Sequence, residues 1–298
     1  MVGSLGTASV RVPTSSTDPR TYERFFKLYA DAMSAAERHS GIQLDFTGCV
    51  FLHQHAVAFL GGLVRALQHR GCTVEARLDS IAATVWSNLS RNGFIRTMGL
   101  HPAGAGGNTA IPFRQDAVRD DTSYLRYLRE AWLGRGWVNV TDGVADAIAN
   151  AVWEIYTNAF EHGHSDIGVF SCGQFYPTKK EIALAFIDFG VGIPASVRTV
   201  REAAHLGDGE AIAWALARGN TSKPGNRGVG LDILRAFVEI NRGYMDVVSH
   251  RGHVRITESG AQPLLRNYGF PGTVFNITFK ADERRYAFSS EIDAEGIF

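Results

Sequence analysis

A glycine-rich and nearly uncharged stretch, HPAGAGGNTAIP, is the clearest break in this sequence and the strongest constraint on its fold. Strand-like and helix-like segments alternate before it, whereas strand-like segments predominate after it. At 298 residues the chain is long enough for two compact domains, each with its own core. We therefore expect a first domain at residues 1–100, a linker at 101–113 and a second domain at 114–298.

The first domain has the pattern of an α/β fold. Apolar residues recur at helical spacing after Pro19 and stop before Gly41. The strand GIQLDF, the helix HAVAFLGGLVRALQHRG, the strand TVEARL and the helix IAATVWSNLSRNGF follow in that order. Such alternation predicts a sheet covered by helices.

Charge and cysteine usage exclude several classes of protein. The 30 basic residues balance the 30 acidic ones, so no overall field recruits nucleic acid or anionic lipid. No apolar stretch reaches membrane-spanning length, and the N-terminus lacks the layout of a signal peptide. The 3 cysteines show no CxxC spacing, which is typical of reduced thiols. We expect a cytoplasmic protein with no nucleic-acid or membrane partner.

The second domain is expected to be an α+β sandwich. A helix is predicted around TSYLRYLREAWLG and a longer one after Thr141. Strands are predicted at IGVFSCG, EIALAFID, MDVVS, HVRIT and TVFNITFK. In the longer helix, one apolar stripe faces a core; it consists of Val144, Ile148, Val152, Ile155 and Ala159.

Three polar residues share another face of that helix. Glu154, Asn158 and His162 are spaced four and four. A glutamate can take a proton from water or a hydroxyl, and one amide oxygen is a sufficient direct anchor for Mg²⁺. A solvated helix face gives the same spacing, so this helix alone does not decide between the two interpretations.

The stretch AFIDFGVGIP is a buried strand that turns through glycines after Asp188. The triplet Asp188-Phe189-Gly190 also occurs at the magnesium site of protein kinases, but no His-Arg-Asp loop or comparable strand lysine precedes it here. An aspartate in this position can accept a hydrogen bond from an exocyclic amine, and the glycines let the backbone approach a flat ring. A plain strand-to-loop turn capped by the aspartate is the alternative.

A glycine-rich loop, Gly225 to Gly230, leads directly into a helix predicted to begin near Leu231. Backbone amides at a helix N-terminus form an anion site suited to a triphosphate. The loop is neither a Walker A loop nor a dinucleotide fingerprint, because no GK[ST] follows and the glycine spacing differs. Farther on, Gly272-Thr273 leads into a strand.

In this order the four motifs resemble those of the GHKL superfamily of gyrases, heat-shock chaperones, histidine kinases and MutL proteins. Four motifs of that superfamily are present. The N box E-x-x-x-N-A-x-x-H matches Glu154, Asn158, Ala159 and His162, and the box D-x-G-x-G-I matches Asp188, Gly190, Gly192 and Ile193. The box G-x-G-L matches Gly228, Gly230 and Leu231, and the closing G-T matches Gly272 and Thr273. The resemblance covers about Thr141 to Lys280. It implies a Bergerat-type fold that binds ATP with Mg²⁺.

The resemblance also implies roles for single residues. Asp188 would hold the adenine amine, Asn158 would hold Mg²⁺, and Glu154 would be the catalytic proton acceptor. The segment Ala195 to Arg227 would be the ATP lid. The remaining nucleotide contacts would come from His162, Gly190, Gly192, Ile193, Thr221, Ser222, Lys223, Gly228, Val229, Gly230, Leu231 and Thr273.

The first domain resembles the STAS domain of anti-sigma-factor antagonists. LDFTGCVFLHQHAV gives the strand, the Thr-Gly turn and the helix start of that family, and NGFIRTMGL lies where its third helix is found. The family's D-S-S-G-L, which carries the phosphorylated serine, is replaced by HQHAV from His53 to Val57. His53 and His55 are two apart and could form a metal pair or be ordinary histidines at a helix N-terminus.

Three functions fit these motifs. One is a partner-switching serine/threonine kinase similar to bacterial anti-sigma kinases, and another is an ATPase with slow turnover that drives a conformational cycle. The alternative is a non-catalytic, ATP-gated protein-binding module. A conventional autophosphorylating histidine kinase fits less well, because residues 112–140 offer one helix and no histidine. A protein partner is expected, and a homodimer is left open.

Overall fold

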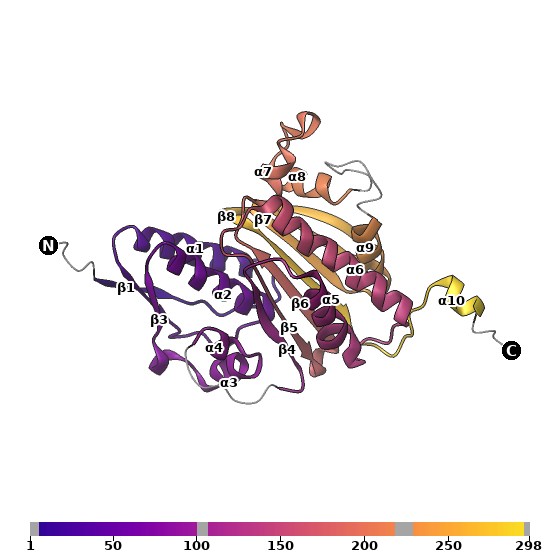
Figure 1. Cartoon of the computed structure of the whole chain (residues 1–298), viewed down its shortest axis with the longest axis horizontal. Helices are drawn as coiled ribbons and strands as arrows, with labels where there is room; N and C mark the ends of the chain where they lie inside the picture. The colour runs from indigo at the N-terminus through magenta and orange to yellow at the C-terminus, as the bar shows by residue number, and fades with distance from the viewer. Residues whose placement is uncertain (1–5, 100–106, 218–228, 295–298) are drawn as a thin grey trace.

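The computed structural model describes residues 6–99, 107–217 and 229–294, which form two sheets with helices around them (Figure 1). In the first domain, three parallel strands lie in the order β1-β2-β3. The strands are β1 (Thr7–Arg11), β2 (Gly41–Asp45) and β3 (Thr73–Ala76). The helices of this domain are α1 (Thr21–Ala36), α2 (Gln54–His69), the 3₁₀ turn η1 (Leu78–Ser80), α3 (Ala83–Arg91) and α4 (Phe94–Thr97).

The second sheet is antiparallel throughout and has the order β4-β5-β6-β8-β7. Its strands are β4 (Ala110–Asp116), β5 (Val169–Tyr176), β6 (Glu181–Asp188), β7 (Tyr244–Thr257) and β8 (Gly260–Lys280). The predicted strands MDVVS and HVRIT are one strand, β7. Residues 110–113 of the expected linker belong to β4, where Pro112 lies at a register shift on an edge strand, a position that tolerates proline.

Helices cover one face of the second sheet. Thr141 caps α6, accepting a hydrogen bond from the Val144 backbone N–H, and the predicted apolar stripe is buried against the sheet. The helical segments of this domain are α5 (Asp121–Arg126), the π-helical η2 (Tyr127–Trp132), η3 (Leu133–Arg135), α6 (Asp142–Asn158), the π-helical η4 (Ala159–Gly163), η5 (Pro177–Lys179), α7 (Gly192–Val197), η6 (Arg201–Ala203), α8 (Asp208–Ala215), α9 (Val229–Asn241) and α10 (Ser289–Ala294). The mixed α/β domain with an antiparallel sheet agrees with the expected sandwich.

The first domain covers the other face of the same sheet, and its core includes residues of that sheet, whereas a second core lies between the sheet and the helices. On β6, Phe186 packs with the helices whereas Ile187 joins the core of the first domain, as alternation along a strand requires. Helix α2 contacts β5 and β6 on one side and β3 on the other. This explains why α2 is apolar and buried almost all round.

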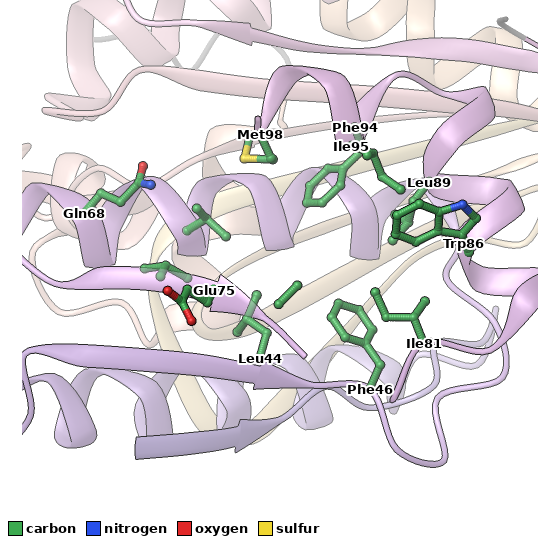
Figure 2. A pocket seen from close by; sticks show the side chains of 13 residues that line it. Leu44, Phe46, Gln68, Glu75, Ile81, Trp86, Leu89, Phe94, Ile95 and Met98 are labelled. Carbon is green, nitrogen blue, oxygen red and sulfur yellow. The ribbon is translucent and has the colours of Figure 1, made fainter. Parts of the chain in front are cut away.

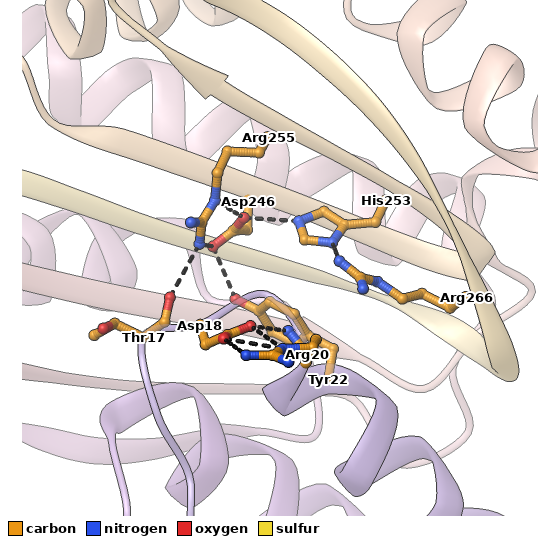
Figure 3. Close-up of polar contacts among 8 residues, drawn as sticks. All are labelled: Thr17, Asp18, Arg20, Tyr22, Asp246, His253, Arg255 and Arg266. Carbon is orange, nitrogen blue, oxygen red and sulfur yellow. Dashed lines mark hydrogen bonds and ion pairs between the residues drawn. The ribbon is translucent and has the colours of Figure 1, made fainter.

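A buried polar cluster adds to this contact between the domains (Figure 3). The Tyr22 hydroxyl of α1 donates to Asp246 Oδ2 of β7 at 3.2 Å, and Arg255 Nε donates to Asp246 Oδ1 at 2.7 Å. His253 Nε2 lies 2.7 Å from the same oxygen, and Arg266 contacts the other nitrogen of His253. Burial disfavours the charged Asp246 carboxylate, but the hydrogen bonds from Arg255 and His253 outweigh it and hold its pKa well below the usual range.

Each helix in the described part of the chain is too short or too polar to span a bilayer.

Candidate functional site

Two cavities in the described part of the chain differ greatly in size. The smaller, about 30 Å³, lies in the first domain between β3 and the helices α3 and α4, and Leu44, Phe46 and Trp86 are among its apolar walls (Figure 2). It has room for about one water molecule. The larger, about 780 Å³, opens on the helical face of the second sheet and has the size of a small-molecule site.

Helix α6 and the π turn η4 that follows it supply polar residues along one wall of the large cavity. Glu154, Asn158 and His162 all line it, which brings the predicted trio together. Asn158 is exposed, whereas Glu154 and His162 are partly buried. His162 does not lie on α6 itself, because the helix widens into the π turn η4 after Asn158. π turns of this kind are often found at functional sites. The sequence did not predict this one, because its polar residues keep the spacing of a regular α-helix.

Asp188 lies at the end of β6, directly opposite Thr273 on β8. Its side chain is buried and accepts a hydrogen bond from the Gly190 backbone N–H at 2.9 Å. Burial raises the pKa of Asp188 to about 6, although hydrogen bonds from Gly190 and Thr273 act in the opposite direction. A buried carboxyl at the floor of a cavity is suited to bind one specific donor group.

The turn after Asp188 needs its glycines for close packing. A Cβ on Gly190 would lie 1.8 Å from the carbonyl oxygen of Gly163, which also accepts a hydrogen bond from the Val191 N–H at 2.7 Å. Gly192 has a φ of 78° and begins α7, and the Ile193 N–H donates to Ser249 Oγ at 3.0 Å. Val191, Gly192 and Ile193 line the cavity, so the turn forms part of its floor.

The first turn of α9 lies directly against Glu154. A Cβ on Gly230 would be 2.3 Å from Glu154 Oε2 and 3.0 Å from the Cα of Ala151. The helix begins at Val229 and has 13 residues, and Leu231 lines the cavity. The positive end of its dipole therefore lies next to the Glu154 carboxylate, at the cavity that Asn158 also lines; such a helix end stabilises a bound anion.

Some predicted residues cannot be placed. Thr221, Ser222, Lys223 and Gly228 lie outside the described residues. Of the expected lid, the described part forms α7, η6 and α8, which pack around Val197, Ala203 and Ala211. Trp214 and Ala215 of α8 line the large cavity.

The residues at the cavity suit Mg²⁺ bound together with phosphates. No three His, Cys, Asp or Glu side chains cluster as metal ligands within the described ranges. Mg²⁺ needs few protein ligands when phosphates and waters complete its shell, and the exposed Asn158 amide beside Glu154 can provide one.

The two histidines of the first domain are buried at the start of α2. His53 Nδ1 lies 2.9 Å from Ser15 Oγ, and the His53 and His55 rings are stacked at 5.7 Å. Neither ring nitrogen of His55 has a hydrogen-bond partner among the described residues. Of the two interpretations left open by the sequence, this geometry favours buried histidines at a helix N-terminus.

Several cavity residues were missed by the sequence analysis. Phe186 lies two residues before Asp188, and Phe275 lies two residues after Thr273, so strand alternation could have identified both. Arg119 at the cavity forms an ion pair with Glu161 at 3.0 Å. Arg119 and Trp214 reach the cavity through tertiary packing, for which no local pattern exists.

Comparison with known families agrees with this geometry. Residues 143–283 match the family model described as histidine kinase-, DNA gyrase B-, and HSP90-like ATPase, which covers a little under half of the chain. No curated protein matches the chain. The matched segment contains Glu154, Asn158 and Asp188 as well as the start of α9. This match supports the assignment of residues 143–283 to the GHKL superfamily of ATP-binding ATPases and kinases.

Proposed function

We propose that the protein binds ATP with Mg²⁺ in the large cavity and uses nucleotide turnover to switch its binding to a protein partner. One observation carries this proposal: a buried aspartate at the floor of a cavity of about 780 Å³ whose wall combines Glu154, Asn158 and the N-terminus of α9. The family match of the same segment supports it.

Each group has a chemical role in this proposal. The Asp188 carboxylate accepts a hydrogen bond from the adenine amine, and Phe186 and Phe275 provide apolar surface for the base. The first turn of α9 binds the phosphates through its backbone N–H groups. Asn158 anchors Mg²⁺, which when bound neutralises phosphate charge.

Glu154 is the proposed general base. It takes the proton of the attacking water in hydrolysis, or of a serine or threonine hydroxyl in protein phosphorylation, as the terminal phosphoryl group leaves ADP. Both reactions use the same carboxylate, so the geometry fits a slow ATPase and an anti-sigma-type kinase equally. A cytoplasmic signalling protein of either kind remains our proposal.

The first domain is the proposed partner-binding unit. Its STAS-like sequence pattern supports this role, and the absence of a hydroxyl in the stretch His53 to Val57 argues against phosphorylation at the family's usual position. The alternative function is a non-catalytic module in which ATP alone gates partner binding, with α7 and α8 at the cavity rim. A homodimer is compatible with either function.

Labelled ATP separates these functions. The purified chain is incubated with Mg²⁺ and ATP labelled on the terminal phosphate, and free phosphate is compared with phosphoprotein. Glu154→Ala and the isosteric Glu154→Gln should both lower turnover by roughly 100-fold or more while nucleotide binding survives. Asp188→Asn should weaken binding strongly, because one amide oxygen cannot replace two carboxylate oxygens: the new NH2 group faces either the Gly190 N–H, which donates to Asp188 now, or the adenine amine.

Two results would contradict parts of this proposal. Normal turnover by Glu154→Gln would show that another group is the base. Wild-type protein that binds ATP with Mg²⁺ but forms neither product would support the non-catalytic alternative.

A further inference from the structure

Phe189 follows Asp188 directly but packs on the opposite side of the sheet. Asp188 lines the large cavity, whereas Phe189 packs against the core of the first domain. Its ring centroid lies 5.6 Å from that of Phe59 on α2 and 6.1 Å from that of Tyr29 on α1. Phe270 of β8 completes the contact at 4.8 Å. Two successive residues therefore connect the cavity to the first domain.

The contact between Phe189 and α2 requires a glycine. A Cβ on Gly62 would lie 1.9 Å from Cε2 of the Phe189 ring and 2.5 Å from its Cζ. The ring therefore lies directly on the backbone of α2, closer than any other residue at position 62 allows. Since α2 is packed on both sides, it cannot move away from the ring without disturbing both sheets.

The cavity side of the same turn is equally constrained. Gly190 is packed against the carbonyl oxygen of Gly163, and its N–H donates to the Asp188 carboxylate. The turn is thus held between the end of η4 on one side and α2 on the other. A displacement of Phe189 must shift Asp188, Gly190 or both, because they are its covalent neighbours.

We propose that Phe189 is a positioning residue for Asp188, and that α2 of the first domain sets the affinity for adenine nucleotides through the contact between Gly62 and Phe189. This inference rests on the proposed function and adds a route of regulation to it. A partner that displaces α2 changes nucleotide affinity, and by thermodynamic linkage bound nucleotide changes partner affinity by the same factor.

A substitution in α2, outside the cavity, tests the route. Gly62→Ala adds one methyl group against the Phe189 ring, and calorimetric titration with ADP and Mg²⁺ measures the affinity. We expect binding to weaken about tenfold. In the double variant Gly62→Ala/Phe189→Leu the smaller side chain makes room, and affinity should return to that of Phe189→Leu alone.

The neighbouring glycine gives a matched control. A Cβ on Gly61 would lie 2.4 Å from Cζ of Phe113 of β4, whose ring packs against that of Phe94 at 5.2 Å, and would meet Phe170 only at an ordinary contact distance of 3.5 Å. Gly61→Ala makes the same chemical change in the same helix with a comparable clash. Its melting temperature should fall about as far as that of Gly62→Ala, whereas its ADP affinity should stay within about twofold of wild type.

The outcomes distinguish the two proposals. Wild-type protein that binds no ADP contradicts the proposed function, and this inference with it. Wild-type binding with an unchanged affinity in Gly62→Ala, or with an equal loss in Gly61→Ala, overturns the inference alone. If Gly62→Ala does not fold, Phe189→Leu by itself decides, because the inference requires it to bind ADP several-fold more weakly than wild type.

Discussion

At the scale of single residues, the proposed role of Asp188 predicts that nucleotide binding depends on pH. Burial raises its pKa to about 6 in the folded protein. The ionised carboxylate accepts a hydrogen bond from an adenine amine more strongly than the neutral acid does, so affinity should increase as the pH rises toward 6, by at most about tenfold per pH unit, and level off above pH 7. Adenosine is the suitable probe for a titration between pH 5 and pH 8, because it carries no phosphate that titrates in this range. An affinity that is flat over this interval would argue against adenine binding at Asp188.

The same carboxyl affects the stability of the protein without ligand. A pKa raised above that of an unfolded aspartate means that its stabilising contribution is fully present below about pH 4 and is lost as the pH rises through 6. The difference of about two pKa units corresponds to roughly 3 kcal/mol. Part of the free energy of folding is therefore given up near neutral pH to hold an ionised acceptor in the cavity.

Residue identities at the site were predictable to different degrees. Glu154, Asn158 and Asp188 stand in motifs whose spacing is visible in the sequence, and the structure brings them to one cavity. The raised pKa of Asp188 was not predictable, because it depends on burial by residues distant in the chain. The packing of Phe189 against Gly62 was hidden for the same reason, since 127 positions separate two residues that touch.

At the scale of elements, the close approach of α9 to α6 depends on Gly230. An added Cβ would collide with Glu154 Oε2 at 2.3 Å, so Gly230→Ala should displace the proposed base and lower ATP turnover at least about tenfold. Alanine is otherwise favoured over glycine in a helix by about 1 kcal/mol. Gly209→Ala in α8 is the control, because its Cβ would meet only ordinary contacts at 3.7 Å. Turnover in Gly230→Ala equal to that of this control would show that the collision is relieved elsewhere.

Most elements follow from local patterns, and those that do not have identifiable causes. The long helix after Thr141 was predictable from its apolar stripe, and β6 from its apolar run. The π turn at η4 was not, because the sequence keeps helical spacing while the backbone widens after Asn158. β7 continues through His250 and Gly252, where the register shifts, so its two apolar runs looked like separate strands.

At the scale of the whole molecule, the first domain packs against the rear face of the sheet whose front face carries the cavity. The sequence suggested two separate domains because the composition changes around residue 100. The core of the first domain includes alternate residues of β5, β6 and β8. The sequence of these strands shows that both faces of the sheet are apolar, but it does not show which part of the chain covers each face. The buried Asp246 cluster adds to this arrangement: its charge pairs with Arg255 and His253 lie within β7, and the Tyr22 hydroxyl joins α1 to them.

This interface also makes the protein sensitive to acid. Burial lowers the pKa of His53 to about 4 and that of His55 to about 3. The charge of Lys179 lowers the pKa of His53 further. The charges of His53 and Arg255 likewise lower the pKa of His55, whereas that of Asp246 raises it. Because unfolded histidines take up protons near pH 6.5, the stability that these two contribute is intact above that pH and is lost as the pH falls toward 4. At pH 5 the expected loss is about 2 kcal/mol for each histidine.

His55→Phe isolates this contribution. The variant keeps a ring beside Tyr22, whose centroid is 5.4 Å away, and removes two nitrogens that lack partners among the described residues. It should be no less stable than wild type at pH 7.5, and its loss of unfolding free energy between pH 7.5 and pH 5.0 should be about 2 kcal/mol smaller. Denaturant unfolding at both pH values measures this difference, in which the opposite contribution of Asp188 cancels because both proteins contain it. His205→Phe makes the same substitution at an exposed position and is the control. If His55→Phe lost as much unfolding free energy between the two pH values as this control, the histidines at the domain interface would not resist protonation.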